Sequence, residues 1–152
     1  MTSPILITGG AQRLGLAIAK DLLAQQHEVI ITYRTKKPSV DELKGLGARV
    51  IQADFAAQDG ITKLISDVQS QTKTLRAVIH NASDWDQEDD TNDYNQLFQK
   101  MMQVHANTPY QLNLAFQNML ASNDVVSDII HMTDYVQVKG SKKHIAYAAS
   151  KA

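Results

Sequence analysis

The sequence predicts an α/β protein in which a doubly wound parallel sheet is covered by helices on both faces, giving three layers. Short runs rich in β-branched residues alternate along the chain with longer segments of helical periodicity. A glycine-containing turn also links the first apolar run directly to the first helical segment. With 152 residues, of which 43% are hydrophobic and 20% charged, one core is expected. We therefore expect a single domain over residues 1–152.

The hydrophobic pattern predicts five strands separated by helices. Ile5–Ile7 is a short apolar run typical of a buried strand. The apolar residues that follow recur with helical spacing, at Leu14, Ala17, Ile18 and Leu22. Further strands are expected at Val29–Tyr33, 48–52, 75–80 and 124–132, and further helices at 38–46, 58–72 and 94–120. In such a sheet ligands bind at the carboxyl ends of the strands.

Composition excludes several classes of function. The formal net charge is −1, with both signs spread along the chain, so neither a nucleic-acid partner nor an anionic membrane surface is expected. The absence of cysteine excludes disulfides and thiolate metal sites. The opening residues do not resemble a signal peptide, and no apolar run approaches the roughly 20 residues that span a bilayer. We expect a soluble cytoplasmic protein with no membrane partner.

The turn after the first strand, TGGAQRLG at residues 8–15, has the composition of a phosphate-binding loop. Glycines permit a tight turn and close approach of the backbone to a pyrophosphate, which the N-terminus of the next helix stabilises. An ordinary strand-to-helix turn is the alternative, and the strand–loop–helix context favours nucleotide binding. We assign cofactor binding to Thr8, Gly9, Arg13, Leu14 and Gly15.

The end of the second strand indicates which dinucleotide is bound. An NAD site requires an acidic residue here, whereas this strand ends in Tyr33, Arg34 and Thr35, followed by Lys36 and Lys37. A cationic cluster at this place favours the 2′-phosphate of NADP, so NADPH or NADP is the expected cofactor. A solvated basic loop is the alternative.

Tyr147 and Lys151 stand four residues apart in YAASK, which places them on one face of a helix. A free tyrosine has a pKa of about 10, and a nearby cation lowers it by stabilising the phenolate. The pair is therefore suited to proton transfer. A surface pair without function is the alternative for an isolated match of this kind.

The glycine loop together with this pair resembles the short-chain dehydrogenase/reductase family, whose fold is of the Rossmann type. Arg13 departs from the family pattern, because it stands where the middle glycine is usual. The resemblance implies that Asp54 hydrogen-bonds the adenine amino group, although it could simply cap the following helix. It also implies that Asn81, Ala82 and Ser83 pack beside the adenine ribose, since HNAS resembles the family segment NNAG.

The same resemblance implies catalytic roles. Lys151 would also hold the nicotinamide ribose, and Asn107 resembles the asparagine that interrupts a helix and positions a water in the proton relay. An asparagine facing solvent is the alternative at that position. The family serine lies 13 residues before Tyr147, where this chain has Asp134, and Thr133 supplies a hydroxyl only after a shift of one residue. A carboxyl group can hold the tyrosine hydroxyl and relay a proton to a ring nitrogen.

Arg13, Ser83 and Asp134, together with the Tyr–Lys pair, match the pteridine reductase branch of the family. This match implies NADPH-dependent reduction of a 7,8-dihydropterin, such as dihydromonapterin or dihydrofolate, with hydride added to C6 and a proton to N5. Either Tyr147 with Asp134 or a water near Arg13 delivers that proton. The alternatives are a carbonyl reductase that uses Thr133 and a catalytically silent NADP-binding module.

Family members continue well beyond the equivalent of Lys151, so we expect the fold to be incomplete at its C-terminal end and this chain alone to be weakly active or inactive. The full-length parent is expected to be a homo-oligomer, a dimer or tetramer. No metal is expected, because the histidines are scattered and the acids of residues 84–93 lack the spacing of a calcium loop. Those acids predict a solvated loop, in which Trp85 is a candidate wall of the substrate pocket.

Overall fold

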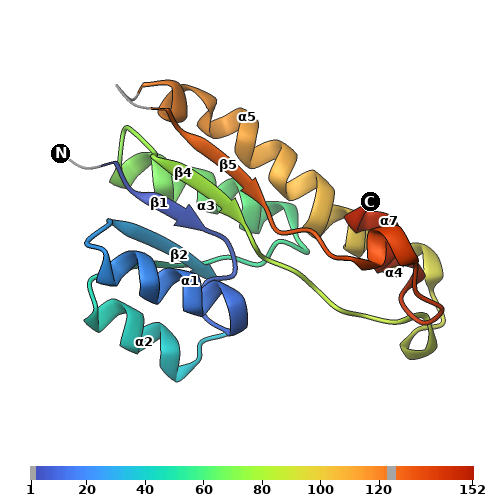
Figure 1. The fold of residues 1–152 in the computed structure, drawn as a ribbon. Coiled ribbons are helices and arrows are strands. Elements are labelled where there is room, and N and C mark those ends of the chain that lie inside the picture. The colour runs from blue at the N-terminus through green and yellow to red at the C-terminus, as the bar shows by residue number, and fades with distance from the viewer. Residues whose placement is uncertain (1–2, 123–125) are drawn as a thin grey trace.

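The computed structural model describes residues 3–122 and 126–152. Five parallel strands form one sheet in the order β3-β2-β1-β4-β5 (Figure 1). The strands are β1 (Ile5–Ile7), β2 (Val29–Tyr33), β3 (Arg49–Gln52), β4 (Ala77–His80) and β5 (Asp128–His131). The predicted doubly wound parallel sheet is therefore confirmed. The fifth strand is shorter than predicted, and residues 124 and 125 of the predicted range lie outside the described residues.

Helices cover both faces of the sheet, which confirms the three layers (Figure 1). The helices are α1 (Arg13–Ala24), α2 (Pro38–Gly45), α3 (Gln58–Gln71), α4 (Tyr94–Met102), α5 (Thr108–Ala121), α6 (Val136–Lys139) and α7 (Ile145–Lys151). Side chains of β1 alternate between the faces: Ile5 and Ile7 pack with α1 and α2, and Leu6 packs with α3 and α5. Each fully buried Ile or Leu contributes about 1.5–3 kcal/mol to folding.

The helix predicted over residues 94–120 is interrupted. Residues Gln103–Asn107 form a π-helical segment, η2, between α4 and α5. Pro109 lacks an N–H and its ring clashes with the preceding turn in a regular helix, which accounts for the irregularity. The Thr108 hydroxyl donates to the carbonyl of Gln103 at 2.8 Å and satisfies an acceptor in this turn. Hydrophobic periodicity alone does not reveal this insertion.

Leu14, which belongs to the helical repeat of the first predicted helix, does not face the core. Its side chain is 52% exposed, and Ala17 is exposed as well. The helix is fully buried only at Gly15 and Ala19. Leu14 instead lies at the entrance of the helix, where it lines a cleft above the sheet. Its assignment to the cofactor site is consistent with this position.

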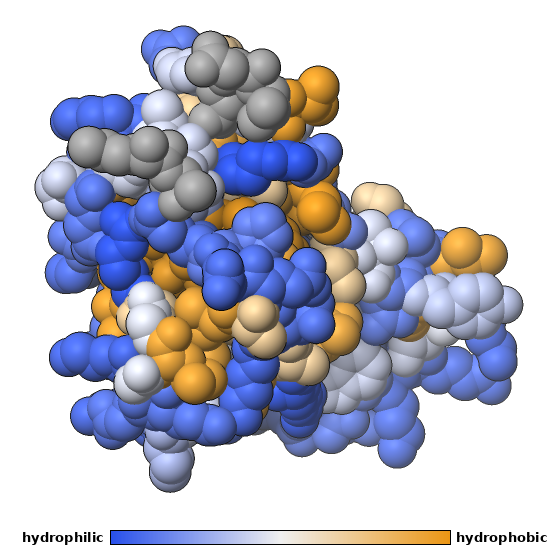
Figure 2. All heavy atoms as spheres, turned by 60° about the vertical axis from the view of Figure 1, so that its left-hand side comes forward, coloured by the Kyte–Doolittle hydropathy of each residue, from blue (hydrophilic) through white to orange (hydrophobic). Residues whose placement is uncertain are grey.

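The surface is mixed in character. Figure 2 shows hydrophilic side chains over much of one face, with hydrophobic residues in small groups between them. Exposed apolar side chains elsewhere include Tyr110 and Leu114 on α5 and Ile129 and Ile130 on β5. Among the described residues, no helix combines the length and apolarity needed to cross a membrane.

Candidate active site

The glycine loop packs tightly against the exit of β4. Gly9 has a φ of +67°, and a Cβ built on it would lie 2.8 Å from the Cα of Ala82. A Cβ on Gly15 would lie 2.4 Å from Nδ2 of Asn81. Both positions therefore require glycine. Arg13 also has a positive φ, of 49°, although it is not glycine.

Thr8 and Asn81 hold this loop in place. The backbone N–H groups of Asn81 and Ala82 both donate to Oγ1 of Thr8 at 3.0 Å. The Asn81 amide donates in return to the carbonyls of Thr8 and Gly9, at 3.0 Å each. Within the described chain, the N-cap residue of α1, Gln12, makes no side-chain capping hydrogen bond. The helix N-terminus thus keeps free N–H donors for an anion.

A cleft of about 480 Å³ opens above the glycine loop at the carboxyl ends of the strands. Its lining includes the predicted cofactor residues Gly9, Arg13, Leu14, Gly15, Tyr33, Arg34, Thr35, Asp54, Asn81, Ala82 and Ser83. Thr8 is buried beneath the loop, and Tyr147 and Lys151 lie outside this lining. Lys37, from the predicted cationic cluster, also lines the cleft, and the structure adds Asp84. Segments far apart in the sequence thus meet in one site.

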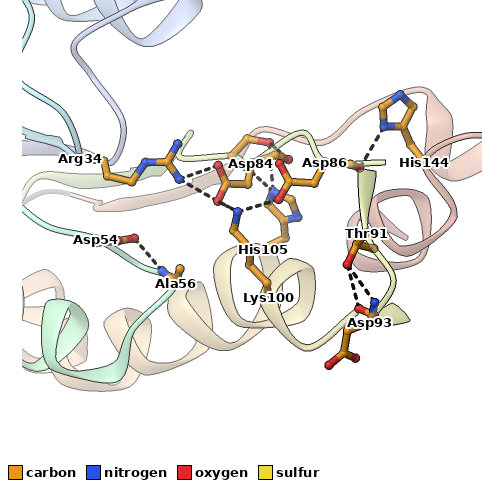
Figure 3. A network of polar contacts seen from close by, with 11 residues as sticks. Arg34, Asp54, Ala56, Asp84, Asp86, Thr91, Asp93, Lys100, His105 and His144 are labelled. Atoms are coloured by element: carbon orange, nitrogen blue, oxygen red, sulfur yellow. Dashed lines mark hydrogen bonds and ion pairs between the residues drawn. The ribbon is translucent and has the colours of Figure 1, made fainter. Parts of the chain in front are cut away.

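The basic residues after β2 are already engaged with neighbours. Nη1 of Arg34 lies 2.7 and 2.8 Å from the two carboxylate oxygens of Asp84 (Figure 3). Lys36 pairs with Asp41 at 3.1 Å, and the ammonium of Lys37 donates to Oε1 of Gln12. A cofactor phosphate at this end of the cleft would therefore meet Arg34 in competition with Asp84.

The sequence predicted that the acidic segment at residues 84–93 is a solvated loop, and this prediction is wrong for Asp84. Its side chain is only 7% exposed, and Lys100 lies 3.2 Å from Oδ2 of Asp84 and 2.6 Å from Oδ2 of Asp86. Burial alone would raise the pKa of Asp84, but hydrogen bonding and charge attraction from Arg34 and Lys100 lower it overall. The side chain is buried because two cations compensate its charge.

Tyr147 and Asp134 form the centre of the predicted catalytic group. The tyrosine hydroxyl donates to Oδ2 of Asp134 at 2.8 Å, and the backbone N–H of Val136 donates to Oδ1 at 2.9 Å. Burial, followed by the hydrogen bond to Asp134, raises the pKa of Tyr147 to about 12, while the Ser83 hydroxyl acts in the opposite direction. The hydrogen bonds from Val136 and Tyr147 lower the pKa of Asp134.

The lowering of the Tyr147 pKa by Lys151 stays a prediction, and in this structure the pKa of Tyr147 is raised. The ammonium of Lys151 lies 5.8 Å from the centroid of the tyrosine ring and donates to the carbonyl of Met132 at 3.2 Å. Burial lowers the pKa of Lys151, and the charge of Asp134 opposes that effect. Burial of the ring and the hydrogen bond to Asp134 keep the pKa of Tyr147 raised, so the tyrosine stays protonated.

The segment after Asp84 supports α7, the helix that carries Tyr147 and Lys151. The carboxylate oxygens of Glu88 accept hydrogen bonds from the backbone N–H groups of Ile145 and Ala146, at 3.0 and 2.8 Å, and so cap α7. Trp85 stacks on His144 with ring centroids 3.8 Å apart and meets the Tyr147 ring edge-on at 4.5 Å. Trp85 is 55% exposed, so one side of its ring system stays open beside the tyrosine.

Two further predicted residues lie in local networks. Oδ1 of Asp54 accepts a hydrogen bond from the N–H of Ala56 at 3.0 Å, and the residue lines the cleft. The amide of Asn107 donates to Oε1 of Gln103 at 2.7 Å, within η2. A role for Asn107 in a proton relay stays a prediction. Over the described residues, no group of three or more candidate ligands could hold a metal ion.

The fold and site together define a Rossmann-type dinucleotide-binding domain that carries a paired tyrosine and lysine beside the nucleotide cleft. The family model for short chain dehydrogenases matches residues 3–152, and the chain belongs to this family. Dihydromonapterin reductase of Klebsiella pneumoniae is 50% identical over 150 residues, which cover 98% of this chain and 62% of that protein. The Escherichia coli dihydromonapterin reductase is 49% identical with the same coverage. The chain thus spans less than two thirds of these relatives.

Solved structures show the same fold. An apo SCOR enzyme from Clostridium thermocellum superposes with a TM-score of 0.87 at 21% identity, covering 99% of this chain and 62% of that one. FolM alternative dihydrofolate reductase 1 from Brucella canis, complexed with NADP, gives a TM-score of 0.81 at 24% identity, covering 98% and 62%. At such identities these likenesses support the fold alone.

Proposed function

We propose that this chain is the cofactor-binding and catalytic part of an NADPH-dependent reductase that converts a 7,8-dihydropterin to its tetrahydro form. The substrate class is that of dihydromonapterin, with dihydrofolate as a second candidate. The hydrogen bond from the Tyr147 hydroxyl to Asp134 carries this proposal. The proposed substrate class is also supported by the sequence comparison, because the chain is about half identical to proteins named dihydromonapterin reductase.

The chain's own residues suit a dinucleotide. The tight glycine positions and the free N–H groups of α1 would hold the pyrophosphate, and Arg13 would add a cation beside it. Arg34 and Lys37 would meet the 2′-phosphate, and Asp54 would meet the adenine. NADPH bound there would supply the hydride that reaches C6 of the pterin.

The Tyr147–Asp134 pair would supply the proton that N5 of the pterin takes up. The pair holds one proton on the tyrosine and a negative charge on the carboxylate, because the pKa of Tyr147 is raised and that of Asp134 is lowered. Asp134 is half-exposed and can take a proton from solvent. Transfer of the tyrosine proton to N5 would leave a tyrosinate, and a proton taken up from solvent through Asp134 would then restore the tyrosine hydroxyl and leave Asp134 ionised. A water near Arg13 is the competing donor.

The carbonyl reductase alternative requires a hydroxyl in place of this carboxylate. Asp134, and not Thr133, contacts the tyrosine hydroxyl, and a carboxylate that accepts a hydrogen bond from the tyrosine has no proton to donate to a ketone oxygen. The geometry therefore favours a substrate that takes a proton on nitrogen.

The test is NADPH oxidation with dihydromonapterin, dihydrofolate and a panel of ketones, run on this chain and on a longer protein spanning the length of its relatives. Pterin turnover that is lost in Tyr147→Phe and reduced in Asp134→Ser supports the proposal. Ketone turnover without pterin turnover overturns it in favour of a carbonyl reductase. A longer protein that binds NADPH but reduces none of these compounds is a silent binding module.

A further inference from the structure

His105, which lies in the π-helical segment η2, joins the two halves of the candidate site, and Figure 3 shows it beside Asp84. On one side, Nε2 accepts from the backbone N–H of Asp84 at 3.1 Å and lies 3.0 Å from the hydroxyl of Ser83. On the other side, Nδ1 lies 2.7 Å from the hydroxyl of Ser150 on α7. The ring also meets the Tyr147 ring edge-on, with centroids 5.3 Å apart.

These contacts determine where the imidazole proton lies. The backbone N–H of Asp84 can only donate, so Nε2 must be the unprotonated nitrogen. The proton of a neutral ring then lies on Nδ1 and donates to the Ser150 hydroxyl. That hydroxyl donates in turn to the carbonyl of Tyr147 at 2.8 Å. Each hydrogen bond in this series is therefore donated in the same direction: by Asp84 to His105, by His105 to Ser150, and by Ser150 to the turn that carries the tyrosine.

We propose that His105 is a positioning residue: as a neutral Nδ1–H imidazole, it fixes the loop at residues 81–84, which lines the cofactor cleft, to the helix that carries Tyr147. The distance between the tyrosine hydroxyl and the cofactor cleft then depends on this bridge. The proposal rests on the proposed function, because the bridge matters for catalysis only if Tyr147 acts on a substrate beside that cleft.

The surroundings keep the ring neutral. Burial, and then the charge of Lys151, lower the pKa of His105 to about 4, and the charge of Asp84 opposes them. Tyr147, on the same helix as Lys151, faces the ring through its aromatic edge and carries no charge at neutral pH. A proton added at Nε2 would point at the N–H of Asp84 and break the bridge.

One experiment tests the bridge without reference to activity. Nitrogen-15 NMR of the histidine rings, with His105→Gln used to assign the signal, reports the tautomer and its titration. We expect an Nδ1–H tautomer that does not titrate around pH 6.5. An Nε2–H tautomer, or a ring that takes up a proton near its ordinary pKa, overturns the proposal even if pterin reduction is confirmed.

A second experiment tests the positioning role by kinetics. His105→Phe keeps the ring contact with Tyr147 but removes the hydrogen bonds to Ser83, Asp84 and Ser150. Ser150→Ala removes the hydroxyl that joins Nδ1 of His105 to the tyrosine carbonyl and leaves the contacts of Nε2 in place. Loss of a buried hydrogen bond of this kind should lower kcat about tenfold. KM for NADPH should change much less, since neither change alters the phosphate loop. The double variant should be little slower than His105→Phe, because both changes break one bridge.

Controls separate positioning from loss of folding. His27→Gln changes an exposed histidine far from the cleft and should leave kcat unchanged. His105→Gln keeps an amide donor and acceptor and should recover part of the rate lost in His105→Phe. Additive effects of the single variants, or equal loss of kcat and of folded fraction, overturn the positioning role. These rates are measured in the longer protein that spans the length of the relatives. If that protein without substitutions binds NADPH but reduces no pterin, the proposed function fails while the tautomer result still stands.

Discussion

Replacing Asp134 with asparagine removes one charge and keeps the shape of the side chain. In the structure one carboxylate oxygen accepts from Val136 and the other from the Tyr147 hydroxyl. The asparagine oxygen can still accept from Val136, while its amide faces the tyrosine oxygen. The variant therefore removes the negative charge that disfavours the phenolate and leaves the burial of the ring unchanged.

The size of the effect follows from the hydrogen bond that is lost. A hydrogen bond to a charged group contributes about 1.5–3 kcal/mol, and 1.36 kcal/mol corresponds to one pH unit in a pKa. Burial is the larger cause of the raised pKa and persists in the variant, so only part of the increase should be lost. We expect the pKa of Tyr147 to fall from about 12 to about 10.5–11.

Ultraviolet difference titration measures this, with Tyr147→Phe subtracted to isolate the signal of one tyrosine. Stability gives a second readout. A folded-state pKa above the unfolded value of about 10 contributes stability that is complete below pH 10 and lost as the pH rises towards 12. Asp134→Asn should weaken that dependence. Asp67→Asn, which removes an exposed carboxylate paired with Lys63, is the control and should leave the titration unchanged. An unchanged Tyr147 pKa in Asp134→Asn would refute this account of the pair.

Three further changes test other parts of the site. Gly15→Ala places a Cβ 2.4 Å from Asn81 and should abolish NADPH binding, measured by energy transfer from the single tryptophan, whereas Gly45→Ala, with nothing within 4 Å, should bind normally. Asp84→Asn leaves Arg34 and Lys100 without their shared partner and should lower the free energy of unfolding by about 1–3 kcal/mol, measured in urea. An unchanged free energy of unfolding would mean that the two cations do not compensate the buried charge as described. Glu88→Ala should cost α7 about 1 kcal/mol and speed amide exchange at Ile145 and Ala146. Burial opposes ionisation of Glu88, but the hydrogen bonds from these amides outweigh it and lower the pKa of Glu88. The stability that Glu88 gives α7 is therefore complete above pH 4.5 and lost as the pH falls through the lowered pKa. Equal amide exchange in both proteins at pH 7 would contradict the capping role.

The parts of the fold that could be predicted from sequence are those set by local pattern. Ile5–Ile7 and Val29–Tyr33 are apolar runs whose length and composition fit buried strands, and the structure has both with the predicted bounds. The glycine loop could be predicted because few other residues permit its geometry. The resemblance to the family implied that Asp134, 13 residues before Tyr147, takes the place of the family serine beside the tyrosine, and the two side chains are hydrogen-bonded.

The rest depended on contacts between distant segments. Glu88 caps a helix that begins 57 residues later, and no local pattern connects the two. Asp84 looked like one of several solvated acids, since only the folded chain brings Arg34 to it from 50 residues away. His105 was one of five scattered histidines, and the π-helical segment that turns it towards α7 has the same hydrophobic periodicity as a regular helix.

The loop that begins at Asp84 connects the cofactor side of the site to its catalytic side. The carboxylate of Asp84 pairs with Arg34 across the cleft, while its backbone N–H donates to His105, which leads to Tyr147. If the 2′-phosphate of NADPH binds Arg34, it must draw the guanidinium from Asp84, and Lys100 is then the only cation among the described residues that still pairs with that buried carboxylate. We therefore expect cofactor binding to shift Asp84 towards Lys100 and to change the hydrogen bond between Asp84 and His105. Because NADH lacks the 2′-phosphate, it should bind without moving the NMR signal of His105, and NADPH should move it.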